Sequence, residues 1–160
     1  MTFNVGDMAV YPVQGVTEIL GIETVEIAGV SSRVYVLRRI DSEDMIRVPV
    51  ANVERVGLRS LVTPAEIDVV MDVLESSGIV VDEPNWNRRY RRYLEKIQSG
   101  SLADVAQVLR DLHLTRADKQ LSYGERRVYE TALQLLVQEL SVAQETDEES
   151  IRSEVEQILG

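Results

Sequence analysis

The period of the hydrophobic pattern changes near residue 60, and this change limits the folds that the chain can adopt. Before it, runs of β-branched and aromatic residues are separated by glycines, which is typical of short strands. These runs are MAVYPV (8–13), VTEILGI (16–22), RVYVLRRI (33–40) and DMIRVPV (44–50). After it, apolar residues recur at helical spacing. The sequence therefore predicts a β-domain over residues 1–60 and a helical domain over residues 61–160.

The strand-like half predicts a small barrel of the Tudor or SH3 type. Pro12 and Pro49 indicate strand ends or edges, because proline has no N–H group to donate to a sheet. A barrel of this size leaves little room for a catalytic cleft and more often provides a docking surface. Tyr11 and Tyr35 leave a second interpretation open, an aromatic cage for methylated lysine.

Polar residues ahead of apolar stripes predict the starts of the helices. Thr63 and Ser122 are each followed three residues later by glutamate, which is the pattern of a capping box, and TDEE (146–149) repeats it. Asn85 and Ser101 are favourable N-cap residues, and Gly78 predicts the end of the first helix. We expect an α+β protein, with a Tudor/SH3-like β-barrel followed by an all-α bundle of about five helices.

The segment PNWNRRYRRYLEK (84–96) is basic, although the chain as a whole has a formal net charge of -10. Residues 84–127 contain ten Lys and Arg against five Asp and Glu. This segregation favours an anion-binding face on a protein whose remaining charge opposes indiscriminate binding of nucleic acid.

Trp86, the single tryptophan, has two interpretations. It begins an apolar stripe at helical spacing, and such a stripe is usually a packing face; the other members are Tyr90, Tyr93, Leu94 and Ile97. However, Arg88 and Arg89 lie in the predicted first turn, where the helix dipole disfavours each cation by about 0.3–1 kcal/mol. Arginines beside the free N–H groups of a helix start favour phosphate, and an aromatic there suits a minor-groove wedge. The pattern leaves both interpretations open.

The sequence contains no Walker, dinucleotide-binding or zinc motif, and nothing in it favours a catalytic carboxylate pair. The lack of cysteine excludes thiolate metal sites, and a single histidine, His113, makes the usual histidine-based sites hard to build. His113 is expected to be structural or exposed. We expect no enzymatic activity, no cofactor and no metal. The lack of cysteine, of a secretory signal and of an apolar run approaching about 20 residues favours a cytoplasmic location.

Five motifs follow one another along the chain: VGDMAVYPVQGV (5–16), VGLR (56–59), NWNRRYRRYLEKI (85–97), VLRDL (108–112) and LSYGERR (121–127). In this order they resemble the CarD/CdnL family, bacterial transcription regulators that bind RNA polymerase. The resemblance extends from about Phe3 to Leu140. It implies a Tudor-like domain that docks on the polymerase β subunit and a helical domain that contacts promoter DNA.

For the helical domain, the resemblance implies a minor-groove wedge at the upstream edge of the transcription bubble. Trp86 would be the wedge and would slow collapse of the open complex. Arg88 and Arg89 match DNA-contact positions of the family, and Arg91 and Arg126 match positions where members have Lys or Arg facing DNA.

For the Tudor-like domain, the resemblance implies that Arg47 pairs with an acid on the polymerase. Val36 and Pro49 would occupy the same strand surface. Val25 stands where some members have a basic docking residue, which implies a weaker or differently balanced contact.

We therefore expect a monomeric transcription regulator that is nucleoid-associated through RNA polymerase. Its contact with promoter DNA should be weak and largely independent of sequence. The alternative is a protein-interaction adaptor whose basic helical face binds an acidic protein partner without DNA contact.

Overall fold

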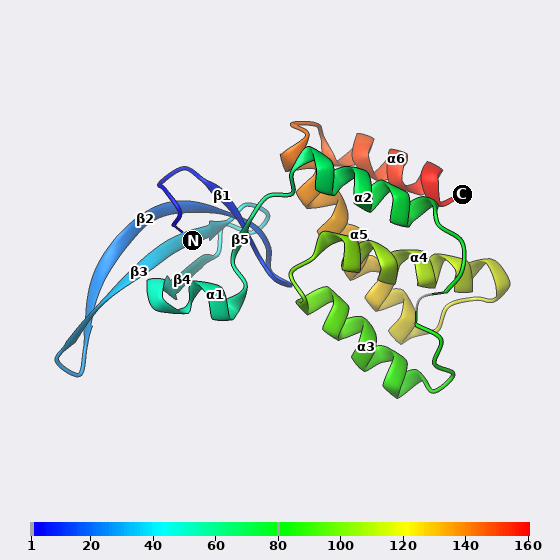
Figure 1. The fold of residues 1–160 in the computed structure, drawn as a ribbon, viewed down its shortest axis with the longest axis horizontal. Helices are drawn as coiled ribbons and strands as arrows, with labels where there is room; N and C mark the ends of the chain where they lie inside the picture. Colours follow the sequence, from blue (N-terminus) through cyan, green and yellow to red (C-terminus); the bar gives the residue numbers. More distant parts are fainter. Residues whose placement is uncertain (1, 80) are drawn as a thin grey trace. The chain divides into compact units, whose positions relative to one another are not determined.

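The strand-like half of the sequence forms a five-stranded antiparallel sheet with the order β4-β3-β2-β1-β5 (Figure 1). The structure, a computed structural model, describes residues 2–79 and 81–160. The strands are β1 (Met8–Tyr11), β2 (Gly15–Ile27), β3 (Val30–Arg39), β4 (Met45–Pro49) and β5 (Arg59–Ser60). A 3-10 turn, η1 (Val50–Asn52), and a short helix, α1 (Val53–Val56), connect β4 to β5.

β2 and β3 are longer than the sequence predicts. They remain paired as far as Ile27 and Val30, whereas β1 and β4 pair only with their inner portions. The outer portions therefore form a two-stranded ribbon. Ala28 and Gly29 close it with φ values of 53° and 77°, the left-handed backbone that a two-residue hairpin turn requires.

Tyr35 belongs to the apolar core of this first unit. Its side chain is 2% exposed, its hydroxyl accepts a 3.1 Å hydrogen bond from the backbone N–H of Phe3, and the two rings meet edge to face. The core consists of Phe3, Ala9, Ile19, Tyr35, Leu37, Val48, Val53 and Leu58. Because Tyr35 is enclosed, the interpretation of Tyr11 and Tyr35 as an aromatic cage for methylated lysine was wrong.

The second half forms the predicted bundle, whose five helices are α2 (Pro64–Glu75), α3 (Trp86–Gln98), α4 (Leu102–Asp118), α5 (Tyr123–Ala143) and α6 (Glu148–Leu159). The Thr63 and Ser122 capping boxes are complete, and Asn85 and Ser101 cap α3 and α4. The α+β fold class is confirmed: a sheet unit over residues 1–61 precedes a helical unit over residues 62–160.

Two helix boundaries differ from the prediction. α6 begins after Asp147, whose carboxylate accepts the Ser150 N–H at 2.9 Å, so Asp147 and not Thr146 is the N-cap. α2 ends at Glu75, before Gly78, because Ser76 has an extended backbone and its hydroxyl donates to the Val73 carbonyl. In both cases a short polar side chain next to the predicted boundary satisfies the helix terminus first.

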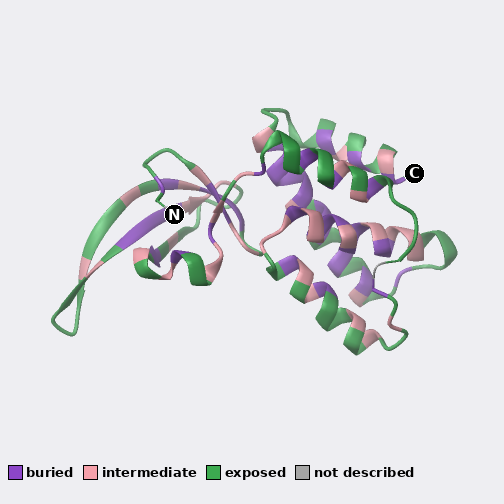
Figure 2. Cartoon of the chain, in the orientation of Figure 1, coloured by how far each residue is buried: buried purple, intermediate pink, exposed green. Residues whose placement is uncertain are grey.

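The buried residues of the bundle form one hydrophobic cluster, and in Figure 2 they colour the parts of the helices that face one another. The fully covered leucines come from three helices: Leu74 from α2, Leu109 and Leu112 from α4, and Leu136 and Leu140 from α5. No helix among residues 2–79 and 81–160 is long and apolar enough to cross a membrane.

Candidate nucleic-acid interface and docking face

The apolar stripe of α3 is core only in its second half. Tyr93 and Ile97 are 1% and 4% exposed, whereas Tyr90 is 39% exposed and Trp86 is half-buried. Asn85 starts the helix by accepting the Arg88 N–H at 3.1 Å, so Trp86 is the first helical residue. Trp86 therefore lies at the margin of the bundle core. It is neither a fully buried packing residue nor a fully exposed wedge.

The indole of Trp86 lies directly against the start of α5. A Cβ atom built on Gly124 would be only 3.1 Å from Trp86 Cζ2 and 3.4 Å from Nε1. On α3 itself, the ring contacts Tyr90, with centroids 5.5 Å apart, and Arg89, whose Cζ is 5.0 Å from the ring centroid. These neighbours follow from helix geometry, because residues three and four positions apart share one side of a helix.

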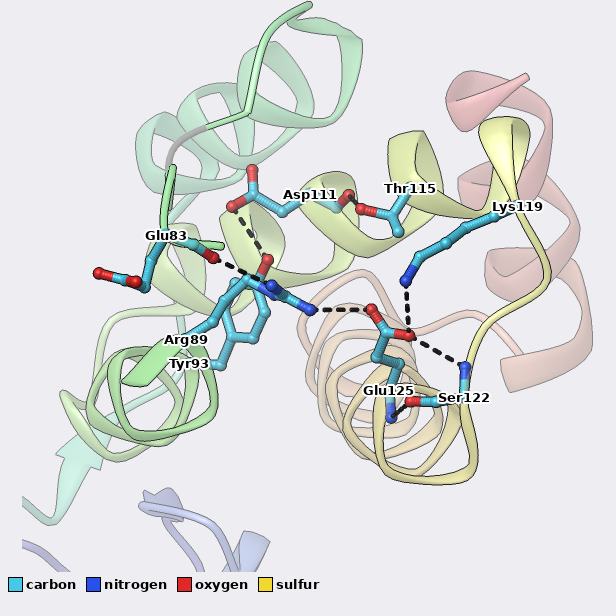
Figure 3. A network of polar contacts seen from close by, with 8 residues as sticks. All are labelled: Glu83, Arg89, Tyr93, Asp111, Thr115, Lys119, Ser122 and Glu125. Atoms are coloured by element: carbon cyan, nitrogen blue, oxygen red, sulfur yellow. Dashed lines mark hydrogen bonds and ion pairs between the residues drawn. The ribbon is translucent and has the colours of Figure 1, made fainter. Parts of the chain in front are cut away.

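Arg89 is turned into the junction between α3 and α5 (Figure 3). One terminal nitrogen donates to the Glu83 carbonyl at 3.0 Å, and the other donates to Glu125 Oε2 at 3.1 Å. The side chains of Arg89 and Glu125 are 17% and 2% exposed. The cation in the first turn of α3 thus has a tertiary carboxylate partner, which offsets its unfavourable position in the helix dipole.

Glu125 is held as a carboxylate by several neighbours. Its Oε1 accepts the Ser122 N–H at 3.0 Å and lies 3.5 Å from Lys119 Nζ. Burial alone would raise the pKa of Glu125. The hydrogen bonds with Ser122 and the positive charges of Lys119 and Arg89 outweigh burial and hold this pKa below its ordinary value.

Asp111 fastens α3 to α4 from the other side of the same network (Figure 3). This buried carboxylate accepts the Val81 N–H at 2.8 Å and the Tyr93 hydroxyl at 3.4 Å. Burial, followed by the charge of Asp111, raises the pKa of Tyr93, so its hydroxyl stays protonated and able to donate.

The remaining arginines of α3 lie on its outer surface. Arg88, Arg91 and Arg92 are exposed, and their spacing of three and four residues aligns them in one stripe. Arg126 is exposed at the start of α5 and lines a shallow hollow with Arg116 and other residues. The adjacent residues Arg88 and Arg89 thus have different surroundings, although the sequence pattern predicts the same role for both.

Other basic residues of the 84–127 segment support the bundle. Lys96 donates to Gln107 at 2.7 Å. Arg110 donates to the carbonyls of Ser76 and Leu159, which joins α4 to the ends of α2 and α6. The basic residues of the 84–127 segment are therefore of two kinds: some form contacts that hold the bundle together, and others are exposed.

The expected docking residues occupy one face of the sheet. Arg47 is paired with Val36, Pro49 with Val34, and Val25 with Ser32, and directly paired residues project to the same side. A bulge between Ile19 and Gly21 keeps this face continuous along β2, opposite the face that carries Tyr35.

The residues of this face differ in accessibility. Arg47 and Pro49 are exposed on the edge strand β4, Val25 is half-buried, and Val36 is only 5% exposed. Arg47 Nε lies 3.6 Å from Glu23 Oε2, and both side chains are more than half exposed. We call Val25, Val36, Arg47 and Pro49 the docking face.

His113 is held by contacts within the bundle. Its Nε2 lies 2.9 Å from the Gly160 carbonyl, and its Nδ1 lies 3.4 Å from the Tyr129 hydroxyl. Within the described part of the chain, no group of three or more His, Asp or Glu side chains is arranged to hold a metal ion.

Comparisons with known proteins agree with this architecture. The family model for the CarD-like/TRCF RID domain matches residues 3–62, and the model for the CarD C-terminal domain matches residues 69–156. A Bacillus subtilis (strain 168) protein named "Putative transcription factor YdeB" is 27% identical over 151 residues, which cover 94% of this chain and 98% of that protein.

One solved structure is also similar in sequence. The solution NMR structure of the 72-residue N-terminal domain of Myxococcus xanthus CarD is 34% identical, with a TM-score of 0.33. The match covers 37% of this chain and 79% of that chain.

The two matching domain models place the chain among transcription regulators that combine a CarD-like/TRCF RID domain with a CarD C-terminal domain. The chain belongs to the CarD family. This membership supports a role in transcription regulation and an interaction with RNA polymerase.

Proposed function

We propose that this protein docks on the RNA polymerase β subunit and stabilises the promoter open complex at the upstream edge of the bubble. The docking face contacts the polymerase, and the start of α3 contacts DNA. The observation that carries the proposal is the position of Trp86, a half-buried ring on the backbone of Gly124 beside an exposed arginine stripe. A ring supported in this way can enter a groove without unfolding the bundle.

On the DNA side, Trp86 acts as the wedge, and Arg88, Arg91 and Arg126 contact phosphates. Unstacking a base step costs a few kcal/mol, and the cost is least where the duplex is already opening. In a plot of log affinity against log salt concentration, each neutralised phosphate contributes about -0.9 to the slope. So few contacts give weak binding that depends little on sequence.

Docking compensates for this weak binding. Attachment through the sheet unit raises the effective concentration of the helical unit at the promoter to about the millimolar range. β4 is an edge strand, and an open edge can pair with a strand of a partner. Arg47 supplies the charge for an acidic partner residue, Pro49 and Val25 supply apolar contact, and Val36 supports Arg47 as its paired residue.

The exposed arginines would also suit an acidic protein, and this is the basis of the adaptor alternative. An aromatic wedge has no purpose there, so Trp86 separates the two functions. The test is DNA protection across a polymerase–promoter complex, with and without the protein, combined with the lifetime of the open complex. We expect added protection at the upstream bubble edge and a longer lifetime, both lost in Trp86→Ala. An unchanged footprint, or equal effects of wild type and Trp86→Ala, would refute the DNA-wedge mechanism.

A further inference from the structure

We infer that Arg89, Gly124 and Glu125 are positioning residues that fix the exposure and orientation of the Trp86 ring, and that Arg89 acts through this ring instead of gripping DNA. We call these three residues the Trp86 support. The inference rests on the proposed wedge function for its role in transcription. The exposure and orientation of the Trp86 ring are properties of the free protein and can be tested in the absence of partners.

Gly124 is the first component of the Trp86 support. It is the second residue of α5, and its φ is not in the left-handed region, so no backbone conformation requires glycine there. Glycine weakens a helix relative to alanine, which makes its presence in this turn unfavourable locally. The compensating contact is the indole, since even a methyl group at this position would lie 3.1 Å from Trp86 Cζ2.

Arg89 is the second component. Its guanidinium lies over the Trp86 ring at 5.0 Å and is held there by the Glu83 carbonyl and the Glu125 carboxylate. To reach a phosphate, Arg89 would have to leave both partners, and Glu125 would then lose its arginine inside the bundle, where it is 2% exposed. Arg88, one residue earlier and exposed, is accessible to DNA without this loss.

Glu125 completes the Trp86 support. It joins three elements, because Ser122 lies before α5, Lys119 follows α4 and Arg89 comes from α3. Removal of the Glu125 charge should therefore release Arg89. The surroundings of the Trp86 ring should then change, although the effect is transmitted through Arg89. This indirect effect is the signature of a positioning residue.

The first experiment uses the fluorescence of the free protein, because Trp86 is the single tryptophan and reports its own environment. We expect Gly124→Ala and Glu125→Gln each to shift Trp86 emission to longer wavelength and to increase its quenching by acrylamide. The matched control is Glu130→Gln, an exposed acid on the same helix, and it should leave both readouts unchanged. Far-UV circular dichroism checks that the helices persist, and Arg89→Gln provides a second route if Glu125→Gln does not fold. Unchanged emission and quenching in folded Gly124→Ala and folded Glu125→Gln or Arg89→Gln would overturn the inference.

The second experiment is a double-mutant cycle on open-complex lifetime, with Arg89→Gln, Glu125→Gln and the pair. If Arg89 acts through the Trp86 support, the double variant should lose no more lifetime than the single variants. A further loss in the double variant would show that Arg89 contacts DNA itself and would overturn its positioning role. Trp86→Ala is measured in parallel: if it has no effect on lifetime, the proposed function fails, while the fluorescence result still decides the geometry.

Discussion

Asp111 and Val81 lie 30 residues apart in the chain, yet an Asp111 carboxylate oxygen accepts a 2.8 Å hydrogen bond from the Val81 backbone N–H. The same oxygen lies 3.4 Å from the hydroxyl of Tyr93 in α3. One buried carboxylate therefore holds both the segment that leads to α3 and α3 itself against α4. Because α3 carries Trp86 and the exposed arginines, the stability of the candidate interface depends on a residue remote from its surface.

Substitution of Asp111 should destabilise the bundle. Asp111→Ala leaves the Val81 N–H and the Tyr93 hydroxyl without this acceptor, which should lower the free energy of unfolding by about 2–4 kcal/mol. Urea denaturation followed by circular dichroism measures this change. Asp118→Ala, an exposed acid on the same helix, is the control and should stay within about 0.5 kcal/mol of wild type. Equal losses in the two variants would contradict the role given to Asp111.

The half-buried position of Trp86 predicts a moderate cost of truncation. Trp86→Ala should lower the free energy of unfolding by about 1–2 kcal/mol, less than the roughly 3–5 kcal/mol typical of a fully buried aromatic. Tyr93→Ala removes such a ring, because Tyr93 is 1% exposed in the same helix, and should show the larger loss. The comparison is made by circular dichroism, since Trp86→Ala removes the fluorophore. A loss in Trp86→Ala equal to that in Tyr93→Ala would make Trp86 a core residue.

Charge reversal on the docking face should abolish polymerase binding. Arg47→Glu places an acid where an acidic partner residue is expected, and like charges repel. Co-purification with RNA polymerase should be lost, with no change in the circular dichroism spectrum. Arg33→Glu is the matched control, since Arg33 is exposed, pairs with Thr24 and projects from the other side of the β2–β3 ribbon. Retained binding by Arg47→Glu would remove Arg47 from the interface.

Salt dependence should distinguish a phosphate contact from a structural arginine. Arg88→Ala should reduce the slope of log affinity against log salt by about 0.9 for the polymerase–promoter complex, as expected for one phosphate contact. Arg152→Ala on α6, where Arg152 donates to Gln134, should leave the slope unchanged. The measurement is a titration of labelled complex at several salt concentrations, and equal slopes for Arg88→Ala and wild type would exclude a phosphate contact at Arg88.

The Arg89–Glu125 pair should make the bundle sensitive to acid. The pKa of Glu125 is lower in the folded protein than its ordinary value of about 4.3. Its contribution to stability is therefore present above the unfolded-state pKa and is lost as the pH falls through the folded-state pKa. The stability of wild type should exceed that of Glu125→Gln at pH 7, and the difference should shrink on acidification. Urea midpoints across this pH range measure the difference, and a constant difference would contradict the assignment.

The helix starts could be predicted because an N-cap interaction is local. Thr63 and Ser122 each bond a residue three positions later, so a short sequence contains the whole interaction. The exception is α6, where Thr146 and Asp147 compete for the same turn and the pattern alone does not rank them. The outer β2–β3 ribbon was missed because most of its residues face solvent on both sides and leave little hydrophobic alternation.

The candidate site could be located from the sequence but not resolved into roles. The unfavourable cations in the first turn of α3 drew attention to Arg88 and Arg89 together. The ion pair with Glu125, 36 residues beyond Arg89, gives Arg89 its structural role, and such a long-range pair leaves no periodic signal. Gly124 could be noticed in LSYGERR as a glycine within a predicted helix. Its role could not be inferred, because that role depends on the indole of Trp86 that lies against it.

The two hydrophobic clusters share no residue: one is built from Phe3–Leu58 and the other from Val62–Leu159. A substitution inside one cluster therefore need not be accommodated by repacking in the other. Core substitutions in the sheet unit and core substitutions in the helical unit can accordingly accumulate independently of each other during evolution.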